Sequence, residues 1–142
     1  MRHYGRWAVV LVATIILSGI LGRGISQTRR NSEDGTDSRA ITDQEWSKEV
    51  LQAKDVVLVD FWATWCGPCQ EMKPIVKSLA KEFKVVMVDV DHNESLSVKH
   101  EVRAIPTVLI FKDGKVVRRF TGVTSEDTLR KTLKSLRQRE GS

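Results

Sequence analysis

Cys66 and Cys69 are the residues of this chain whose type and spacing indicate chemistry. They are its only two cysteines, and Gly67 and Pro68 separate them. Residues three apart on a helix lie about one turn apart on the same face, within reach of a disulfide. The unpaired N–H groups and the positive dipole end at a helix N-terminus stabilise a thiolate. The pair therefore predicts a reactive thiol, Cys66, with a resolving partner, Cys69.

The segments on either side of the cysteines predict the elements that position them. Residues 56–62 form an almost unbroken run of apolar, strand-forming residues, which is typical of a strand buried on both faces. Over 68–83, apolar residues recur three or four apart, as on one face of a helix. Pro68 suits the first helical position because it lacks an N–H. We therefore expect Cys66 at a helix N-terminus after a central strand, and a kink at Pro74.

The rest of the chain alternates strands and helices. Thr42 and Glu45 match a capping box and predict a first helix. A strand over 85–90, a short helix over 94–100 capped by Asn93, two strands over 107–111 and 116–120, and a last helix from Thr124 or Ser125 are expected to follow. Asp113-Gly114 between the two late strands predicts a two-residue hairpin turn. This order indicates an α/β fold, a mixed sheet with helices on both faces.

The segment 59–69, Val-Asp-Phe-Trp-Ala-Thr-Trp-Cys-Gly-Pro-Cys, closely resembles the active-site segment of thioredoxins. The resemblance extends over roughly residues 41–139 and includes Pro74, Ile105-Pro106-Thr107, Asp113-Gly114 and Gly122. It implies a thioredoxin fold and a thiol–disulfide oxidoreductase that reduces protein disulfides. The Gly-Pro dipeptide implies a reductant, because thiol oxidases and isomerases of this fold usually carry histidine at the position of Pro68.

The resemblance also implies the roles of individual residues. Cys66 attacks a substrate disulfide, and Cys69 then attacks the Cys66 sulfur and releases the reduced substrate. Asp60 is expected to be buried, with a raised pKa, and to exchange a proton with Cys69. Many thioredoxins place a lysine near this aspartate, whereas this chain has Met87 at the matching position. Without that cation, Asp60 should be protonated more easily.

Substrate binding is expected around the two cysteines. Pro106 resembles the cis-proline of the family, which lets the backbone of Ile105 pair with an extended substrate. The expected substrate-binding residues are Trp65, Gly67, Pro68, Ile105, Pro106 and Gly122, while Trp62 fits this surface and the core equally well. No cofactor and no metal are expected, since His3, His92 and His100 are not placed by motif near the cysteines. An iron–sulfur cluster bridging a dimer is the one metal alternative.

The N-terminus predicts a membrane or export segment. An apolar run over 7–22 follows Arg2 and Arg6 and precedes Arg23. As a helix this run would be about 24 Å long, shorter than a bilayer core of about 30 Å, although flanking arginines can snorkel. We expect a signal anchor, transmembrane or signal segment over 1–25, a flexible polar linker over 26–38 and a thioredoxin domain over 39–142. We therefore expect the protein to be anchored to a membrane or exported, and we favour the extracytoplasmic face of the membrane over the cytoplasmic face. The alternative locations are mitochondrial and cytoplasmic.

Alternatives to a protein-disulfide reductase remain open. An extracytoplasmic thiol oxidase or isomerase, or a thioredoxin of cytochrome maturation, would use the same dithiol, and an interaction module would not need it. The expected partners are disulfide-containing proteins, the membrane, and an electron donor, either a thioredoxin reductase or a membrane thiol carrier. The protein is expected to be a monomer. A net charge of +5 without a basic groove and interleaved aromatic residues argues against nucleic acid.

Overall fold

The structure is a computed structural model that describes residues 41–139 of the chain. The segments predicted as anchor (1–25) and linker (26–38) lie outside the described residues.

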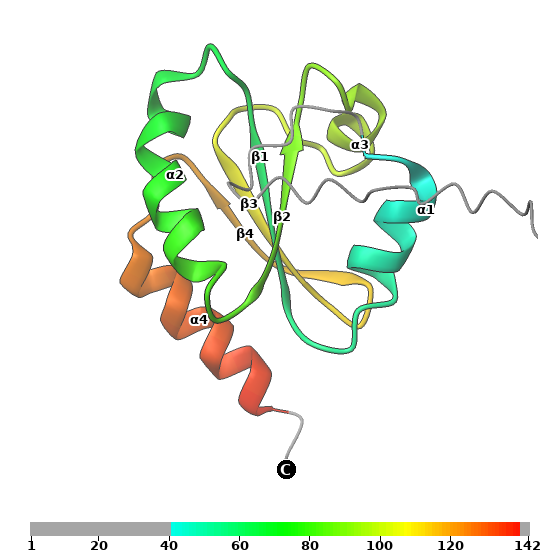
Figure 1. The fold of residues 1–142 in the computed structure, drawn as a ribbon, viewed down its shortest axis with the longest axis vertical. Coiled ribbons are helices and arrows are strands. Elements are labelled where there is room, and N and C mark those ends of the chain that lie inside the picture. The colour runs from blue at the N-terminus through cyan, green and yellow to red at the C-terminus, as the bar shows by residue number, and fades with distance from the viewer. Residues whose placement is uncertain (1–40, 140–142) are drawn as a thin grey trace, which may run out of the picture. The chain divides into compact units, whose positions relative to one another are not determined.

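A mixed four-stranded sheet forms the centre of the fold, with strand order β2-β1-β3-β4 (Figure 1). Strand β1 (Val57–Trp62) pairs in parallel with β2 (Lys84–Asp89) and antiparallel with β3 (Thr107–Lys112). Strand β4 (Lys115–Thr121) pairs antiparallel with β3. The expected mixed sheet is confirmed, and the strand that leads to the cysteines is an inner strand of the sheet.

Helices cover both faces of the sheet. Helices α2 (Gly67–Leu79) and α4 (Glu126–Gln138) lie on one face, and α3 (Glu94–Lys99) lies on the other with α1 (Asp43–Trp46) and its π-helical continuation η1 (Ser47–Leu51) (Figure 1). Because side chains alternate along a strand, β1 supplies both cores. Leu58 packs in the α2/α4 core with Met72, while Val59 packs in the opposite core with Trp46. All six residues of β1 are buried, as the apolar run predicts.

Local capping signals in the sequence are largely confirmed. Thr42 and Glu45 form both hydrogen bonds of the capping box, at 3.2 and 2.9 Å. Ser125 caps α4 by accepting the Thr128 N–H at 3.3 Å. Helix α2 begins one residue earlier than expected, so that Cys66 is the N-cap and Pro68 is the second helical residue. The missing N–H of Pro68 still costs nothing, because the N–H groups of the first turn have no partner within the helix.

Asn93 differs from its predicted role. It stands at the N-cap position of α3, but its side chain makes no capping hydrogen bond. Its Oδ1 instead accepts the Ile41 N–H at 2.8 Å, and its Nδ2 donates to the Asp89 carbonyl at 2.8 Å. Both ends of the amide are thus used for contacts across the fold, which tie Ile41 to the end of β2.

The hairpin turn between β3 and β4 is confirmed. Asp113 and Gly114 have φ values of 50° and 71°, and positive φ at both positions is typical of a type I′ turn. A Cβ atom on Gly114 would lie 2.7 Å from the backbone oxygen of Leu51. Gly122 also has positive φ, at 88°, but a Cβ atom there would meet no heavy atom within 4 Å.

These two glycines allow backbone strain to be separated from a steric clash. We expect Gly122→Ala to lower the free energy of unfolding by about 1–2 kcal/mol, the cost of a left-handed conformation. Gly114→Ala should lower it by about 1–3 kcal/mol more, because the backbone of Leu51 must move. Chemical denaturation of both variants measures this difference. Equal losses would show that contact with Leu51 does not matter.

Candidate active site

Strand β1 and helix α2 together position the two cysteines. The strand ends at Trp62, and the chain turns so that Cys66 becomes the N-cap of α2. The Cys66 sulfur accepts the backbone N–H of Cys69 at 3.2 Å, and the two residues form a disulfide with a Cα–Cα distance of 5.3 Å. Cys66 is 5% exposed and Cys69 only 1%. The N-terminal position that the sequence predicts for Cys66 is therefore confirmed.

Trp62 belongs to the core beneath the cysteines. It is 2% exposed and clusters with Ala63, Cys66 and Cys69. The Lys73 ammonium lies 4.7 Å from the centroid of the Trp62 ring, within range of a cation–π interaction. The structure thus assigns Trp62 to the core rather than to an exposed substrate-binding surface.

Asp60 lies in the middle of β1 and is 1% exposed. Burial raises the pKa of its carboxyl group from 3.8 to about 7. Its Oδ1 has no hydrogen-bond partner among the described residues. On β2 the residue in register is Met87, which also packs against the cluster that contains the cysteines. The predicted burial and raised pKa are confirmed, and Met87 does stand beside Asp60.

The segment before β3 brings three of the predicted binding residues together. The Ile105–Pro106 peptide bond is cis, as expected from the sequence. The Pro106 carbonyl accepts the Gly122 N–H at 2.8 Å, and Ile105 packs against the cluster that contains Cys66 and Cys69. Within residues 41–139, no backbone hydrogen bond outside the regular elements uses the Ile105 N–H or carbonyl.

Trp65 is the large apolar side chain that stands at the surface beside Cys66. It is 69% exposed, and its indole Nε1 donates a hydrogen bond to Asp91 Oδ2 at 2.8 Å. Val123, next to Gly122, is 48% exposed. Sequence reasoning missed both Asp91 and Val123. Asp91 carries no motif signal, whereas an apolar residue directly after the predicted Gly122 was a signal for Val123.

The described histidines contact other groups. His92 Nδ1 lies 3.2 Å from the Asp89 carboxylate, and the ring of His100 packs against Trp46 and Phe111. Across residues 41–139, no group of three or more His, Cys, Asp or Glu side chains is arranged to hold a metal ion.

Comparisons with known proteins give the same family as the resemblance. The family model for thioredoxin matches residues 37–135. Thioredoxin 1 of Synechococcus elongatus is 44% identical over 98 residues, which cover 66% of this chain and 92% of that protein. The chloroplastic thioredoxin M4 of Arabidopsis thaliana is 39% identical over 97 residues, 66% of this chain and 50% of that protein. A solved structure, a single-residue mutant of a thioredoxin from Halobacterium salinarum, has a TM-score of 0.65 at 38% identity and covers 70% of this chain and 88% of that one.

The predicted membrane-anchored or exported location is contradicted. The relatives are thioredoxins, none of those named above is described as anchored or exported, and one is named as chloroplastic. In the part of the chain that the structure describes, no helix is long and apolar enough to cross a membrane. The prediction relied on the apolar run over 7–22, whose length as a helix, about 24 Å, already falls short of a bilayer core.

The similarity concerns the residues that form the site. The matched residues 37–135 contain all four strands and helix α2, and so include Asp60, both cysteines, Pro106 and Gly122. Cys66 and Cys69 form a Cys-x-x-Cys pair at disulfide distance. This chain therefore belongs to the thioredoxin family, and it is a thiol–disulfide oxidoreductase that acts on proteins.

Proposed function

We propose that this protein reduces disulfides of partner proteins, with Cys66 as the nucleophile and Cys69 as the resolving thiol. The observation that carries the proposal is the position of the Cys66 sulfur at the N-terminus of α2, where it accepts the N–H of Cys69. In the reduced protein a Cys66 thiolate would receive this hydrogen bond and the field of the helix dipole. Cys69 is more deeply buried, which disfavours its thiolate until a proton acceptor acts.

The cycle balances without a cofactor. The Cys66 thiolate attacks one sulfur of the substrate disulfide, forms a mixed disulfide and expels the other sulfur as a thiolate, which takes up a proton. Cys69 then loses its proton and attacks the Cys66 sulfur. This step breaks the mixed disulfide, releases the second substrate thiol and leaves the Cys66–Cys69 disulfide. Two electrons pass to the substrate, and a reductase of the kind that serves thioredoxins restores the dithiol.

Asp60 is the proton acceptor for Cys69 in this proposal. A carboxyl group with a pKa of about 7 exchanges protons readily at neutral pH. The partner in register on β2 is the neutral Met87, so that position contributes no cation to lower the pKa. Met87, which stands in register with Asp60, also packs against the cluster that contains Cys69, and this supports a short path for the proton between the carboxyl group and the thiol.

Substrates dock as extended segments across the surface formed by Trp65, Gly67, Pro68, Ile105 and Gly122, with the buried Pro106 next to Ile105, and we add Val123 to this surface. Two features support this docking: the exposed apolar area at Trp65 and Val123, and the backbone groups of Ile105, which have no hydrogen-bond partner among residues 41–139. The hydrogen bond to Asp91 holds the Trp65 ring in place, so less side-chain entropy is lost on binding.

Because both cysteines belong to one helix, the cycle needs no second copy, and we propose that the protein acts as a monomer.

Cysteine variants test the order of the two attacks. We expect Cys69→Ser to accumulate a mixed disulfide with a disulfide-bonded protein such as insulin, because Cys66 attacks and nothing resolves the adduct. Cys66→Ser should form no comparable adduct, since Cys69 is more deeply buried than Cys66 and does not hold the N-cap position of α2. Mass spectrometry under non-reducing conditions measures the adducts. Equal adduct formation by the two variants would overturn the assignment of the nucleophile.

The direction of the reaction is tested by the reduction potential. We expect the Cys66–Cys69 pair to lie near the value of about −270 mV typical of thioredoxin, far from about −120 mV for a strong oxidant. Pro68→His should raise the potential by about 30 mV or more, a roughly tenfold change in the equilibrium constant, by stabilising the thiolate. Pro68→Ala is the matched control for loss of the proline ring. Equilibration with glutathione buffers measures all three proteins, and a wild-type value in the oxidant range would refute a reductase.

The role of Asp60 predicts different effects on the two steps. Asp60→Asn should slow release of the reduced substrate by about 10²-fold, because Cys69 loses its proton acceptor, and should slow the first attack much less. Only the deprotonated carboxylate accepts a proton, so the wild-type release rate should rise with pH through about 7. The variant should lack this rise.

Single-turnover kinetics with a preformed mixed disulfide isolate the release step, and the Cys69→Ser background isolates the first attack. Glu71→Gln, an exposed carboxylate of α2, is the control and should change neither rate. If Asp60→Asn slowed both steps equally, Asp60 would act on the structure of the site rather than as a proton acceptor for Cys69.

A further inference from the structure

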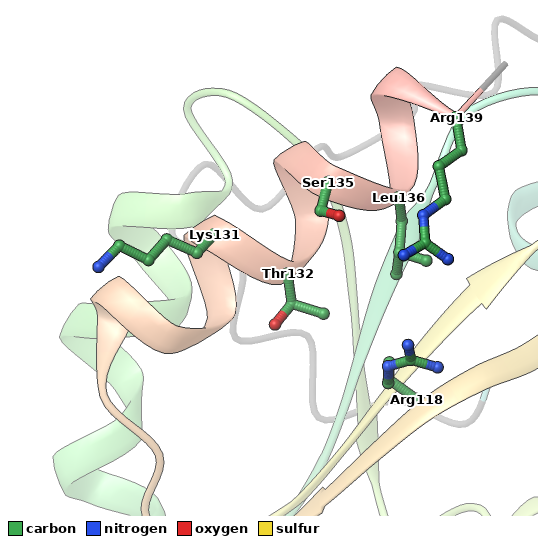
Figure 2. A pocket seen from close by; sticks show the side chains of 6 residues that line it. All are labelled: Arg118, Lys131, Thr132, Ser135, Leu136 and Arg139. Carbon is green, nitrogen blue, oxygen red and sulfur yellow. The ribbon is translucent and has the colours of Figure 1, made fainter. Parts of the chain in front are cut away.

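An open pocket of about 270 Å³, called the cavity below, lies at the surface between strand β4 and the second half of helix α4, and Arg118 and Arg139 at its rim are exposed. No residue of the cysteine cluster lines it (Figure 2). Arg118 of β4 faces it, and the remaining lining residues are Lys131, Thr132, Ser135, Leu136 and Arg139. Ser125, the N-cap of α4, follows three residues after Gly122, which belongs to the proposed substrate surface. A helix rises about 1.5 Å per residue, so Ser135 lies about 15 Å along α4 from Ser125. The cavity is therefore separate from the proposed substrate surface.

Two guanidinium groups face each other in this cavity. Figure 2 shows the Arg139 side chain directed from the end of α4 toward β4, where Arg118 stands, with Leu136 beside them and Ser135 and Thr132 farther back along the helix. Two like charges directed into one space repel each other. An anion between them would remove this repulsion and receive charge-assisted hydrogen bonds from both arginines.

Hydrogen-bond donors in the cavity are available for a ligand. One N–H of the Arg118 guanidinium donates to the Val117 carbonyl at 2.7 Å. Most of the five N–H donors of this side chain are therefore available to other acceptors. Among residues 41–139, Arg139 forms no ion pair, and no carboxylate lines the cavity. The Ser135 hydroxyl is exposed and has no hydrogen-bond partner there.

Lys131 and Thr132 contribute less than the arginines. The Lys131 ammonium pairs with Asp127 at 2.8 Å and extends away from the arginines in Figure 2. The Thr132 hydroxyl already donates to the Thr128 carbonyl at 2.8 Å. The C-terminal end of α4 carries a partial negative charge, but two guanidinium charges outweigh it, and Lys112 also donates to the Leu136 carbonyl at 2.8 Å.

We propose that Arg118 and Arg139 clamp a phosphate group in this cavity, with the Ser135 hydroxyl as a further donor. A guanidinium group binds an oxyanion through two parallel hydrogen bonds. Two guanidinium groups can therefore donate four such hydrogen bonds to one ligand, whereas a carboxylate has only two oxygens to accept them. A phosphate or phosphomonoester supplies three or four. The cavity is slightly smaller than the roughly 300–1,000 Å³ of pockets for drug-sized ligands, which favours a small ligand or the phosphate end of a larger one.

Titration of the full chain with inorganic phosphate at constant ionic strength tests this site. We expect saturable NMR shifts of the backbone amides of Arg118 and of 131–139. Arg118→Gln and Arg139→Gln should each weaken binding about tenfold, by removing a bidentate partner. Arg103→Gln removes the same charge from an exposed position elsewhere and should change the affinity less than twofold. Neither Arg118→Gln nor Arg139→Gln should alter the rate of disulfide reduction, so failure of this site is distinguishable from failure of the proposed reductase.

Two further ligands identify the source of the phosphate. Tighter binding of 5′-AMP than of inorganic phosphate would support the clamp with a phosphomonoester as its ligand, and equal binding would support it with free phosphate. Adenosine should not shift these amides. Non-saturating shifts, an equal loss of affinity in Arg103→Gln, or shifts of the same amides by adenosine would each overturn the proposal.

Discussion

Burial of strand β1 on both faces is the constraint on which the site depends. Leu58 and Val59 belong to opposite cores, so the strand requires helices on both sides and ends where α2 begins. Asp60 shares this burial, and desolvation raises its pKa to about 7. Between about pH 4 and pH 7 the folded protein therefore binds more protons at Asp60 than the unfolded chain does. The free energy of unfolding therefore falls as pH rises through this range, and above pH 7 the fold bears the full destabilisation from the ionised, buried Asp60.

The fold places opposite electrostatic environments next to each other. At the N-terminus of α2, backbone N–H groups and the helix dipole favour negative charge on Cys66. In the adjoining core, desolvation disfavours negative charge on Asp60. Titratable groups whose environments push their pKa values apart are the usual basis of acid–base assignments in active sites. An apolar core beneath the cysteines, with Trp62 and Met87, maintains this contrast by excluding water.

Helix α4 connects two different surfaces. Its N-terminal cap, Ser125, follows shortly after Gly122, whose N–H bonds to Pro106 at the dithiol end of the sheet. Its middle buries Leu129 and Leu133 in the core with Leu58 and Met72. The second half carries the basic cavity on its remaining face. A ligand there would contact the helix without touching the redox site.

Features that depend on neighbouring residues could be predicted before the fold was known: the dithiol at a helix start, the capping box of Thr42, the Asp113-Gly114 turn and the buried strand. Their interactions span four residues or fewer, or follow from an apolar run, so patterns reveal them. Contacts between distant residues depend instead on how the elements pack. The Trp65–Asp91 hydrogen bond joins positions 26 apart, and the Ile41–Asn93 bond joins positions 52 apart. The sequence contains all of these residues, but it does not display the packing that brings them within hydrogen-bond distance.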